Sequence, residues 1–308
     1  MEYSNLPDMK GLATLRAVVE LGGVEQAGRS LHIGQPAVTK RLRALESCYG
    51  ITLMQRKGRK LELTPAGDRV YAFARLALDH QATLLEDLQS LLHGHNQLRL
   101  EVTMAIGEHL LPDLLLNFSE EYPEYRIQSR MGYSRSIQPR LATGLSDLAL
   151  LELAPDHPDI LVQKWLEDEL TLVCAPNHPL SRDARLSIDQ LSQQQFVLRE
   201  AQSSIRIMLD QKLRELGIGQ LPTALEVGST DTIVEMLAHG RHLSFLPRFA
   251  VAEALRQGQL RQVSVDPLKI NVTLWIARNR SSVNNPVAEA FIRSCRNFDF
   301  RKVLPPPA

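Results

Sequence analysis

The sequence holds little of what several broad protein classes need. Of its 308 residues only 5% are aromatic, and its three cysteines, Cys48, Cys174 and Cys295, lie far apart. That number and spacing exclude a disulfide scaffold and a cysteine-rich zinc module, and they predict a reducing compartment such as the cytoplasm. No apolar run approaches the roughly 20 residues of a membrane-spanning helix, so no membrane partner is expected. The N-terminus also lacks the apolar segment of a secretory signal.

Sequence motifs for catalysis are missing as well. No G-x-S-x-G is present to place a nucleophilic serine on a sharp turn. Neither G-x-x-x-x-G-K-[ST] nor G-x-G-x-x-G is present to bind the phosphates of a nucleotide. We therefore predict that the protein is not an enzyme and needs no cofactor. An enzyme or a solute-binding protein built from α/β lobes is the alternative.

The charge is balanced overall but unevenly distributed. The chain has 35 basic and 35 acidic residues, whereas residues 1–65 alone carry ten basic and six acidic ones. Between Arg29 and Lys60 there are eight basic residues and a single acidic one, Glu46. A basic head on a mildly acidic body predicts local binding of a polyanion. A chance excess of charge on a solvated surface is the plainer alternative.

The basic head has the pattern of a helix-turn-helix. Residues 8–21 and 24–31 predict two helices, and residues 35–46 predict a third with Pro36 in its first turn. Gly34 is expected to supply the flexible position of the turn before the third helix. Val38, Leu42 and Leu45 would face the core, leaving a polar and basic outer face.

A wing and a long helix are predicted to follow. Residues 51–64 read as a hairpin with a basic tip, and residues 65–92 as a helix that starts after Thr64. The helix carries an apolar stripe, which would pack against a second copy or against its own chain. The stripe comprises Val70, Phe73, Leu76, Ala77, Leu84, Leu85, Leu88 and Leu91. His93 and His95 lie in a polar hinge without nearby thiols or carboxylates, so no metal site is predicted there.

The remaining residues alternate between strand and helix patterns. Strands are predicted at 98–106, in YRIQSRMGY, DLALLEL, TLVCAP, FVLRE, TALEVGS and LSFLP, and in NVTLWIAR near the C-terminus. Such alternation predicts a parallel, doubly wound α/β sheet. Two such lobes would form a cleft where strand ends meet helix starts.

The third helix offers the side chains that read DNA. Glutamine can pair with adenine, arginine with guanine, and an Ala or Thr methyl group can touch the thymine methyl. Lysines and wing arginines meet phosphates and supply affinity without sequence information. A surface helix with mixed polar groups is the alternative for the same residues.

Residues 24–67 resemble the winged helix-turn-helix of LysR-type transcriptional regulators. The family's succession of small residue, leucine, turn, Gln-Pro-Ala, hydroxyl residue, basic pair and Leu-Glu has a counterpart at every step. Those counterparts are Ala27, Leu31, Gln35-Pro36-Ala37, Thr39, Lys40-Arg41 and Leu45-Glu46. Leu63-Thr64-Pro65-Ala66-Gly67 resembles the exit from the family's wing. The resemblance continues more weakly over the rest of the chain, and one departure is Gly28, where the family often has a second alanine.

The resemblance implies a sequence-specific regulator of transcription whose DNA binding or bending responds to a small effector. Members form dimers of dimers through paired linker helices and bind promoter DNA, and RNA polymerase is a further expected partner. The implied domains are a winged helix-turn-helix at 1–65, a linker helix and hinge at 66–97, an effector-binding domain at 98–300 and a tail at 301–308. The effector domain would resemble periplasmic binding proteins, with lobe I at 98–166 and 271–296 and lobe II at 167–270.

The resemblance and the residue chemistry together assign two sets of contacts. The expected DNA-binding residues are Gln35, Pro36, Ala37, Thr39, Lys40, Arg41, Arg43, Arg56, Arg59 and Lys60. The expected effector-binding residues are Thr103, Met104, Ser134, Ser203, Ser204, Ser229 and Thr230. The hydroxyl groups of the second set could bind an oxygen-rich ligand, or they could only cap the helices that begin there.

A small organic acid is the effector that these residues suggest. Met104 and Ala105 would make one wall apolar, while Arg135 and Arg206 could pair with a carboxylate. Glu108 and Glu200 would oppose an anion if they faced inward. Some family members sense peroxide through a cysteine pair in lobe II, but residues 201–209 contain no cysteine, so a disulfide switch is not expected.

Overall fold

The computed structural model describes most of the chain as two compact units. The described residues are 6–57, 60–93, 96–181, 185–266, 268–280 and 285–300. One unit ends at His93 and the other begins at residue 94. Arg59, His95 and the predicted tail lie outside the described residues, as do the side chains of Lys60, Leu91 and His93. No described helix combines the length and apolarity needed to cross a membrane.

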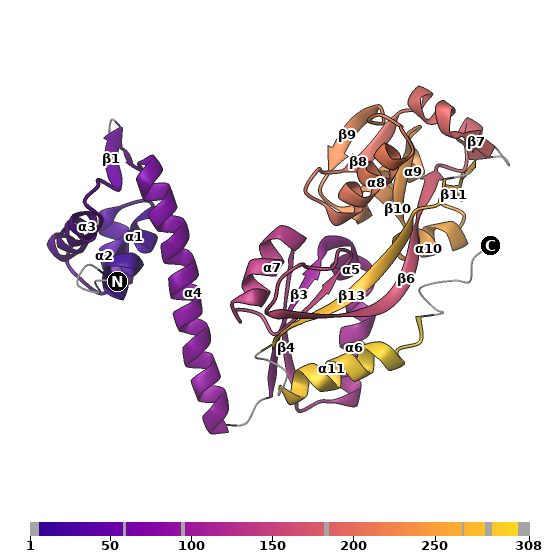
Figure 1. Cartoon of the computed structure of the whole chain (residues 1–308). Coiled ribbons are helices and arrows are strands. Elements are labelled where there is room, and N and C mark those ends of the chain that lie inside the picture. Colours follow the sequence, from indigo (N-terminus) through magenta and orange to yellow (C-terminus); the bar gives the residue numbers. More distant parts are fainter. Residues whose placement is uncertain are drawn as a thin grey trace. The chain divides into compact units, whose positions relative to one another are not determined.

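The N-terminal unit is a winged helix-turn-helix followed by a long helix (Figure 1). Asp8 caps the first helix by accepting a hydrogen bond from the Gly11 amide at 2.6 Å. Thr64 similarly accepts from the Gly67 amide at 3.0 Å and so begins the long helix. The elements are α1 (Met9–Glu20), α2 (Val24–Ser30), α3 (Gln35–Tyr49), the antiparallel pair β1 (Met54–Lys57) and β2 (Lys60–Leu63), and α4 (Pro65–His93).

The turn between α2 and α3 differs from the prediction. Gly34 is in extended conformation with φ of −69° and precedes the first residue of α3. The left-handed residue is His32, with φ of 53°. The turn also explains Gly28, because a Cβ atom there would come within 2.8 Å of the Ile33 carbonyl oxygen. A glycine therefore lets the turn lie close against α2.

The core of the N-terminal unit follows the predicted apolar faces. Val38, Leu42 and Leu45 of α3 are buried as expected, whereas Met9 at the start of α1 is 39% exposed. The buried cluster comprises Leu12, Leu15, Val18, Ala27, Val38, Leu42, Leu45, Leu53 and Ala74.

The C-terminal unit is built on a mixed sheet in the order β10-β6-β13-β5-β3-β4, with β11 also paired to β6. Only β3, β4 and β5 pair in parallel, because β13 and β10 are antiparallel to their neighbours. The strands are β3 (Gln97–Thr103), β4 (Arg126–Gly132), β5 (Leu148–Leu151), β6 (Ile160–Cys174), β10 (Ser244–Pro247), β11 (Arg261–Gln262) and β13 (Asn271–Asn279). The predicted parallel pairing therefore holds for β3, β4 and β5 of this sheet but not for β6, β10 and β13.

The long strand β6 accounts for this difference. The TLVCAP segment does not begin a new strand but continues β6, which pairs with β13 as far as Glu169 and with β10 from Leu170. One continuous strand thus leads from lobe I, built on β3, β4 and β5, to lobe II (Figure 1). Lobe II adds two parallel pairs, β8 (Phe196–Arg199) with β9 (Thr223–Val227) and β7 (Arg185–Ser187) with β12 (Ser264–Asp266).

The helices of the C-terminal unit cover this sheet. The first strand ends at Thr103, three residues earlier than predicted, and Met104 already begins a helix. The helices are α5 (Met104–His109), α6 (Leu111–Glu121), α7 (Ser134–Ala142), α8 (Ser204–Glu215), α9 (Thr230–His239), α10 (Arg248–Arg256) and α11 (Pro286–Asn297). Short 3-10 turns occur at η2 (Pro179–Ser181) and η3 (Ile188–Gln193). One apolar core runs through both lobes, from Leu98 and Val102 to Phe196 and Phe245.

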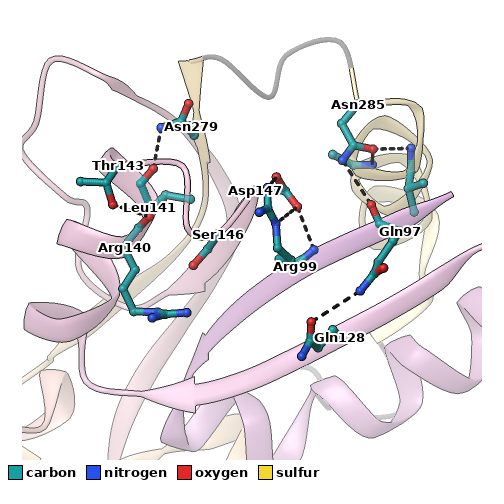
Figure 2. A network of polar contacts seen from close by, with 12 residues as sticks. Gln97, Arg99, Gln128, Arg140, Leu141, Thr143, Ser146, Asp147, Asn279 and Asn285 are labelled. Carbon is teal, nitrogen blue, oxygen red and sulfur yellow. Dashed lines mark hydrogen bonds and ion pairs between the residues drawn. The ribbon is translucent and has the colours of Figure 1, made fainter. Parts of the chain in front are cut away.

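A polar network holds together the edge of lobe I where the chain enters it (Figure 2). Asp147 accepts from the Arg99 backbone amide at 2.9 Å and from its guanidinium at 2.7 Å, which ties β3 to the residue before β5. Asn279 at the end of β13 donates to the Leu141 carbonyl oxygen at 2.6 Å. Asn285 donates to the Gln97 carbonyl oxygen at 3.4 Å and caps α11. The bonds of Asp147 and Asn279 satisfy buried polar groups that would otherwise be costly to bury.

Candidate functional site

The outward face of α3 carries half of the residues predicted to contact DNA. An open groove on this face is lined by Gln35, Pro36, Thr39, Lys40 and Arg43. Lys40 and Arg43 are exposed and form no ion pair with any described residue. The structure does not bring Ala37 and Arg41 to this groove, and both are half-buried.

The hairpin β1–β2 presents a second basic surface. Arg56 is exposed in β1, and Lys57 lies 3.9 Å from Glu62 with 80% of its side chain exposed. Glu46, the single acidic residue of the basic stretch, accepts from the backbone amides of Leu53 and Met54 at 2.8 and 3.3 Å. Its carboxylate therefore fixes the start of the hairpin to the end of α3.

The apolar stripe of α4 is divided between a buried and an exposed part. Val70 and Ala77 pack onto the core of their own unit. The other described members are about half exposed: Phe73, Leu76, Leu84, Leu85 and Leu88. Five large apolar side chains on one helix form an exposed patch of the kind that marks a protein–protein contact.

A small pocket lies in the C-terminal unit at the carboxyl ends of β3, β5 and β8. Its volume is about 10 Å³, roughly the space that one water molecule needs. The lining residues are Thr103, Met104, Ala105, Gly132, Tyr133, Glu152, Arg199, Ser203, Ser204 and Ile205. The pocket thus brings together residues of both lobes, as expected for a cleft at strand ends.

Four of the seven predicted effector residues line this pocket: Thr103, Met104, Ser203 and Ser204. Ser134 does not line it, but its Oγ lies 2.8 Å from the Ser204 Oγ and forms a hydrogen bond between the lobes. Ser229 instead caps α9 by accepting from the Thr232 amide at 3.3 Å. Thr230 is fully buried, and its Oγ1 accepts from the Arg199 guanidinium at 2.7 Å.

Two charged residues of the pocket were not predicted from the sequence. Glu152 follows β5 and Arg199 ends β8, and each is only 3% exposed. Arg199 pairs with both carboxylate oxygens of Glu200, at 3.0 and 3.1 Å. Burial raises the pKa of Glu152, and hydrogen bonds from Thr103 and Ser204 oppose this rise only in part. The available signal was a charged residue at the carboxyl end of an otherwise apolar strand.

The arginines considered as partners of a carboxylate ligand lie elsewhere. Arg206 is buried, but its Nε binds both oxygens of Asp210 at 2.9 Å, and its Nη1 donates to the Arg199 carbonyl oxygen. Arg135 is exposed and hydrogen-bonds Gln202. Neither arginine lines the pocket. The side chain of Arg206 points to its own helix because Asp210 lies one turn further on.

The two lobes meet again where α5 faces the start of α9. The Thr230 amide donates to Glu108 Oε2 at 3.0 Å, and His109 Nε2 lies 3.4 Å from Asp231 Oδ1. Burial lowers the pKa of His109, although the two nearby carboxylates oppose this. Ligand atoms of Glu108, His109 and Asp231 lie within 4.8 Å of one another. We assign no metal to them, since Glu108 already binds an α9 amide and a helix N-terminus disfavours a cation.

Two cysteine thiols of the C-terminal unit are poorly suited to redox chemistry. Cys174 and Cys295 are fully buried. Burial raises the pKa of Cys174 to about 11 and also raises that of Cys295. A thiol that stays protonated is a poor nucleophile, so this unit lacks the reactive thiolate of a peroxide sensor.

Comparisons with known proteins agree with this architecture. Residues 9–68 match the model of the bacterial regulatory helix-turn-helix protein, lysR family, and residues 93–299 match the LysR substrate binding domain. A probable RuBisCO transcriptional regulator of Cyanidium caldarium is 32% identical over 288 residues, which cover 91% of this chain and 90% of that protein.

Solved structures show the same fold at lower identity. Full-length CbnR complexed with its target DNA has a TM-score of 0.71 at 20% identity, covering 94% of this chain and 99% of that one. The CcmR regulatory domain of Synechocystis PCC6803, in complex with 2-PG, has a TM-score of 0.60 at 21% identity, covering 69% and 99%. The matched relatives are named as regulators, which sets aside the enzyme and solute-binding alternatives. The chain belongs to the LysR family of bacterial transcriptional regulators.

Proposed function

We propose that the protein binds promoter DNA through α3, whose groove-lining face enters the major groove. Gln35, Thr39 and Arg43 read base edges there, while Lys40 and the wing residue Arg56 contact phosphates. The observation that carries this assignment is the exposed face of α3, where two basic side chains have no ion-pair partner among the described residues. A regulator that binds promoter DNA acts in the cytoplasm and near RNA polymerase.

The domain boundaries follow from the same assignment. The head comprises 1–65, the linker helix and hinge 66–97, and the effector domain 98–300. The lobe boundary at 166/167 falls within β6, which is the strand that leads from one lobe to the other.

The linker helix is the proposed dimerisation element. Phe73, Leu76, Leu84 and Leu88 of one chain pack against α4 of a second chain, because pairing would remove this patch from water. Two such dimers assemble into a dimer of dimers, which presents paired heads to DNA.

The effector is a small organic acid that binds between the lobes. The pocket offers the Thr103, Ser203 and Ser204 hydroxyls and the first amides of α8, while Met104, Ala105 and Ile205 supply apolar contacts. In the present structure Ser134 and Ser204 bridge the lobes directly, so the ligand enters as they separate. The related CcmR domain was solved with the small molecule 2-PG, which supports a ligand of this size.

A gel-shift assay with DNA upstream of the protein's own gene tests the regulatory function. A thermal-shift screen of metabolites tests the effector, because a ligand raises stability by mass action. A ligand found in this way should lose affinity for Ser203→Ala while the variant still binds DNA. If the ligand is a cation, or binds this variant as tightly as wild type, the proposed effector class is wrong.

A further inference from the structure

An acidic side chain inside the pocket has an oxygen without a hydrogen-bond partner. Glu152 is 3% exposed and lines the pocket, and its Oε2 is buried with no hydrogen-bond partner among the described residues. Leaving a buried oxygen without a hydrogen-bond partner is costly, and more so when the group is charged. A lining residue kept in that condition points to a ligand atom that completes its bonding.

Burial favours the neutral form of Glu152 more than the nearby charges favour its ionised form. Arg199 is the one cation among the lining residues, and Glu200 already neutralises it through two hydrogen bonds. Tyr133, the other titratable lining residue, has a raised pKa because it hydrogen-bonds Glu200, so it stays neutral near pH 7. An ionised Glu152 would therefore add an uncompensated negative charge to a buried pocket, which is costly. Burial accordingly raises the pKa of the Glu152 carboxyl.

The wall of the pocket that α8 forms is suited to an anion. The first turn of α8, from Ser204, faces the pocket, and its N-cap residue Ser203 makes no side-chain capping bond to the helix amides. These amides carry the positive end of a twelve-residue helix. An anion held there and an ionised Glu152 would repel each other, whereas a protonated carboxyl could donate to the anion.

We propose that Glu152 binds the effector as a neutral carboxylic acid and donates a hydrogen bond to an anionic oxygen of the ligand. This inference rests on the proposed effector pocket and names the ligand chemistry as an oxyanion, such as a carboxylate, phosphate or sulfate group. When Glu152 is ionised before binding, one proton is taken up from solvent with each ligand. Anion affinity then falls as pH rises above the pKa of Glu152, by at most tenfold per pH unit.

Sulfate is a suitable probe because it stays fully ionised across the pH range of interest. Its binding to the full chain can be measured by calorimetry from about pH 6 to about pH 8, with chloride keeping ionic strength constant. Above the pKa of Glu152 we expect the wild-type Kd to rise with pH, by up to about tenfold per unit. Glu152→Gln, which keeps an N–H donor but cannot ionise, should bind sulfate with a Kd independent of pH. His109→Gln is the matched control, because it removes another buried titratable group and should retain the wild-type slope.

An infrared measurement tests the protonation state of Glu152 directly. The sulfate complex of the wild type at pH 8 should show the C=O band of a protonated carboxyl that Glu152→Gln lacks, whether the proton enters with the anion or is already present. Absence of this band from the wild-type complex, a wild-type pH slope that Glu152→Gln retains, or no saturable sulfate binding would each overturn the inference.

Ser203→Ala separates this inference from the proposed function. If Ser203→Ala weakens sulfate binding but the wild-type complex lacks the carboxyl C=O band, the pocket stands and only the proton on Glu152 is wrong. If neither Ser203→Ala nor Glu152→Gln changes sulfate binding, the anion binds elsewhere and the proposed effector pocket fails with the inference.

Discussion

At the residue scale, the side chains on the outward face of α3 should determine which DNA sequence is bound. Thr39→Ala and Arg43→Ala each remove a proposed base contact, and each should weaken specific binding by about 1–3 kcal/mol. Gel shifts with specific and scrambled DNA measure the loss, which should be much smaller for scrambled DNA. Arg214→Ala, an exposed arginine of α8, is the control for loss of charge. Unchanged specific binding by both α3 variants would contradict the assignment of α3 as the recognition helix.

The wing should act differently, because a phosphate contact carries no sequence information. Arg56 is exposed in β1 and available to the DNA backbone. Arg56→Ala should weaken specific and scrambled DNA alike, and the slope of log K against log salt should fall by about 0.9. A loss confined to the specific sequence would show instead that Arg56 reads a base.

At the scale of single elements, α4 should hold two chains together. Leu84→Asp combined with Leu88→Asp places two charges in the proposed seam, where burial without partners is costly. Light scattering should then show a smaller species than wild type. Ala82 is also exposed but lies almost opposite Phe73 at 100° per residue, so Ala82→Asp should keep the wild-type assembly. A wild type that is already monomeric at micromolar concentration would contradict the proposal.

The lobe-crossing strand β6 contains an acid whose titration should affect stability. Asp168 accepts from the Phe249 amide at the start of α10 at 3.4 Å, and burial raises its pKa from 3.8 to about 6. The folded state therefore binds this proton more tightly than the unfolded state. The contribution of Asp168 to the free energy of unfolding should fall as pH rises from about 4 to about 6, by no more than about 3 kcal/mol in all.

Asp168→Asn should remove that dependence. The stability of the variant relative to wild type should increase with pH across this window and stay constant above it, as measured by urea unfolding at each pH. Asp113→Asn, at an exposed aspartate of α6, is the control. A constant difference between Asp168→Asn and wild type at all pH values would show that Asp168 titrates normally.

At the scale of the whole C-terminal unit, direct bonds between the lobes should hold the pocket closed. Glu108→Ala removes the acceptor of the Thr230 amide and leaves that donor at the start of α9 without its partner. The first turn of α9 should then exchange its amide hydrogens faster, while the core strands stay protected. Glu235→Ala, at an exposed position on the same helix, should leave exchange unchanged. Equal exchange in both variants would mean that Glu108 does not restrain the lobes.

Sequence patterns predicted the N-terminal unit in detail because its determinants are local. The apolar positions of α3 recur at helical spacing, Pro36 lies in its first turn, and Thr64 precedes α4, so neighbouring residues specify each element. The turn was less well predicted, since the left-handed residue is His32 and not Gly34, and the close approach of Ile33 to Gly28 appears only in the folded chain.

Tertiary structure alone decided the composition of the proposed effector pocket. The alternation of strands and helices determined that two α/β lobes form and that hydroxyl residues gather near helix starts. It could not show that Glu152 and Arg199 enter the pocket, that Arg206 pairs with Asp210 instead, or that Ser229 caps a helix. The reason is physical, because these outcomes depend on side-chain directions and on partners that are remote in the chain. Arg199 with Thr230 and Ser134 with Ser204 are examples. Such partners meet only when the long strand β6 brings the lobes together.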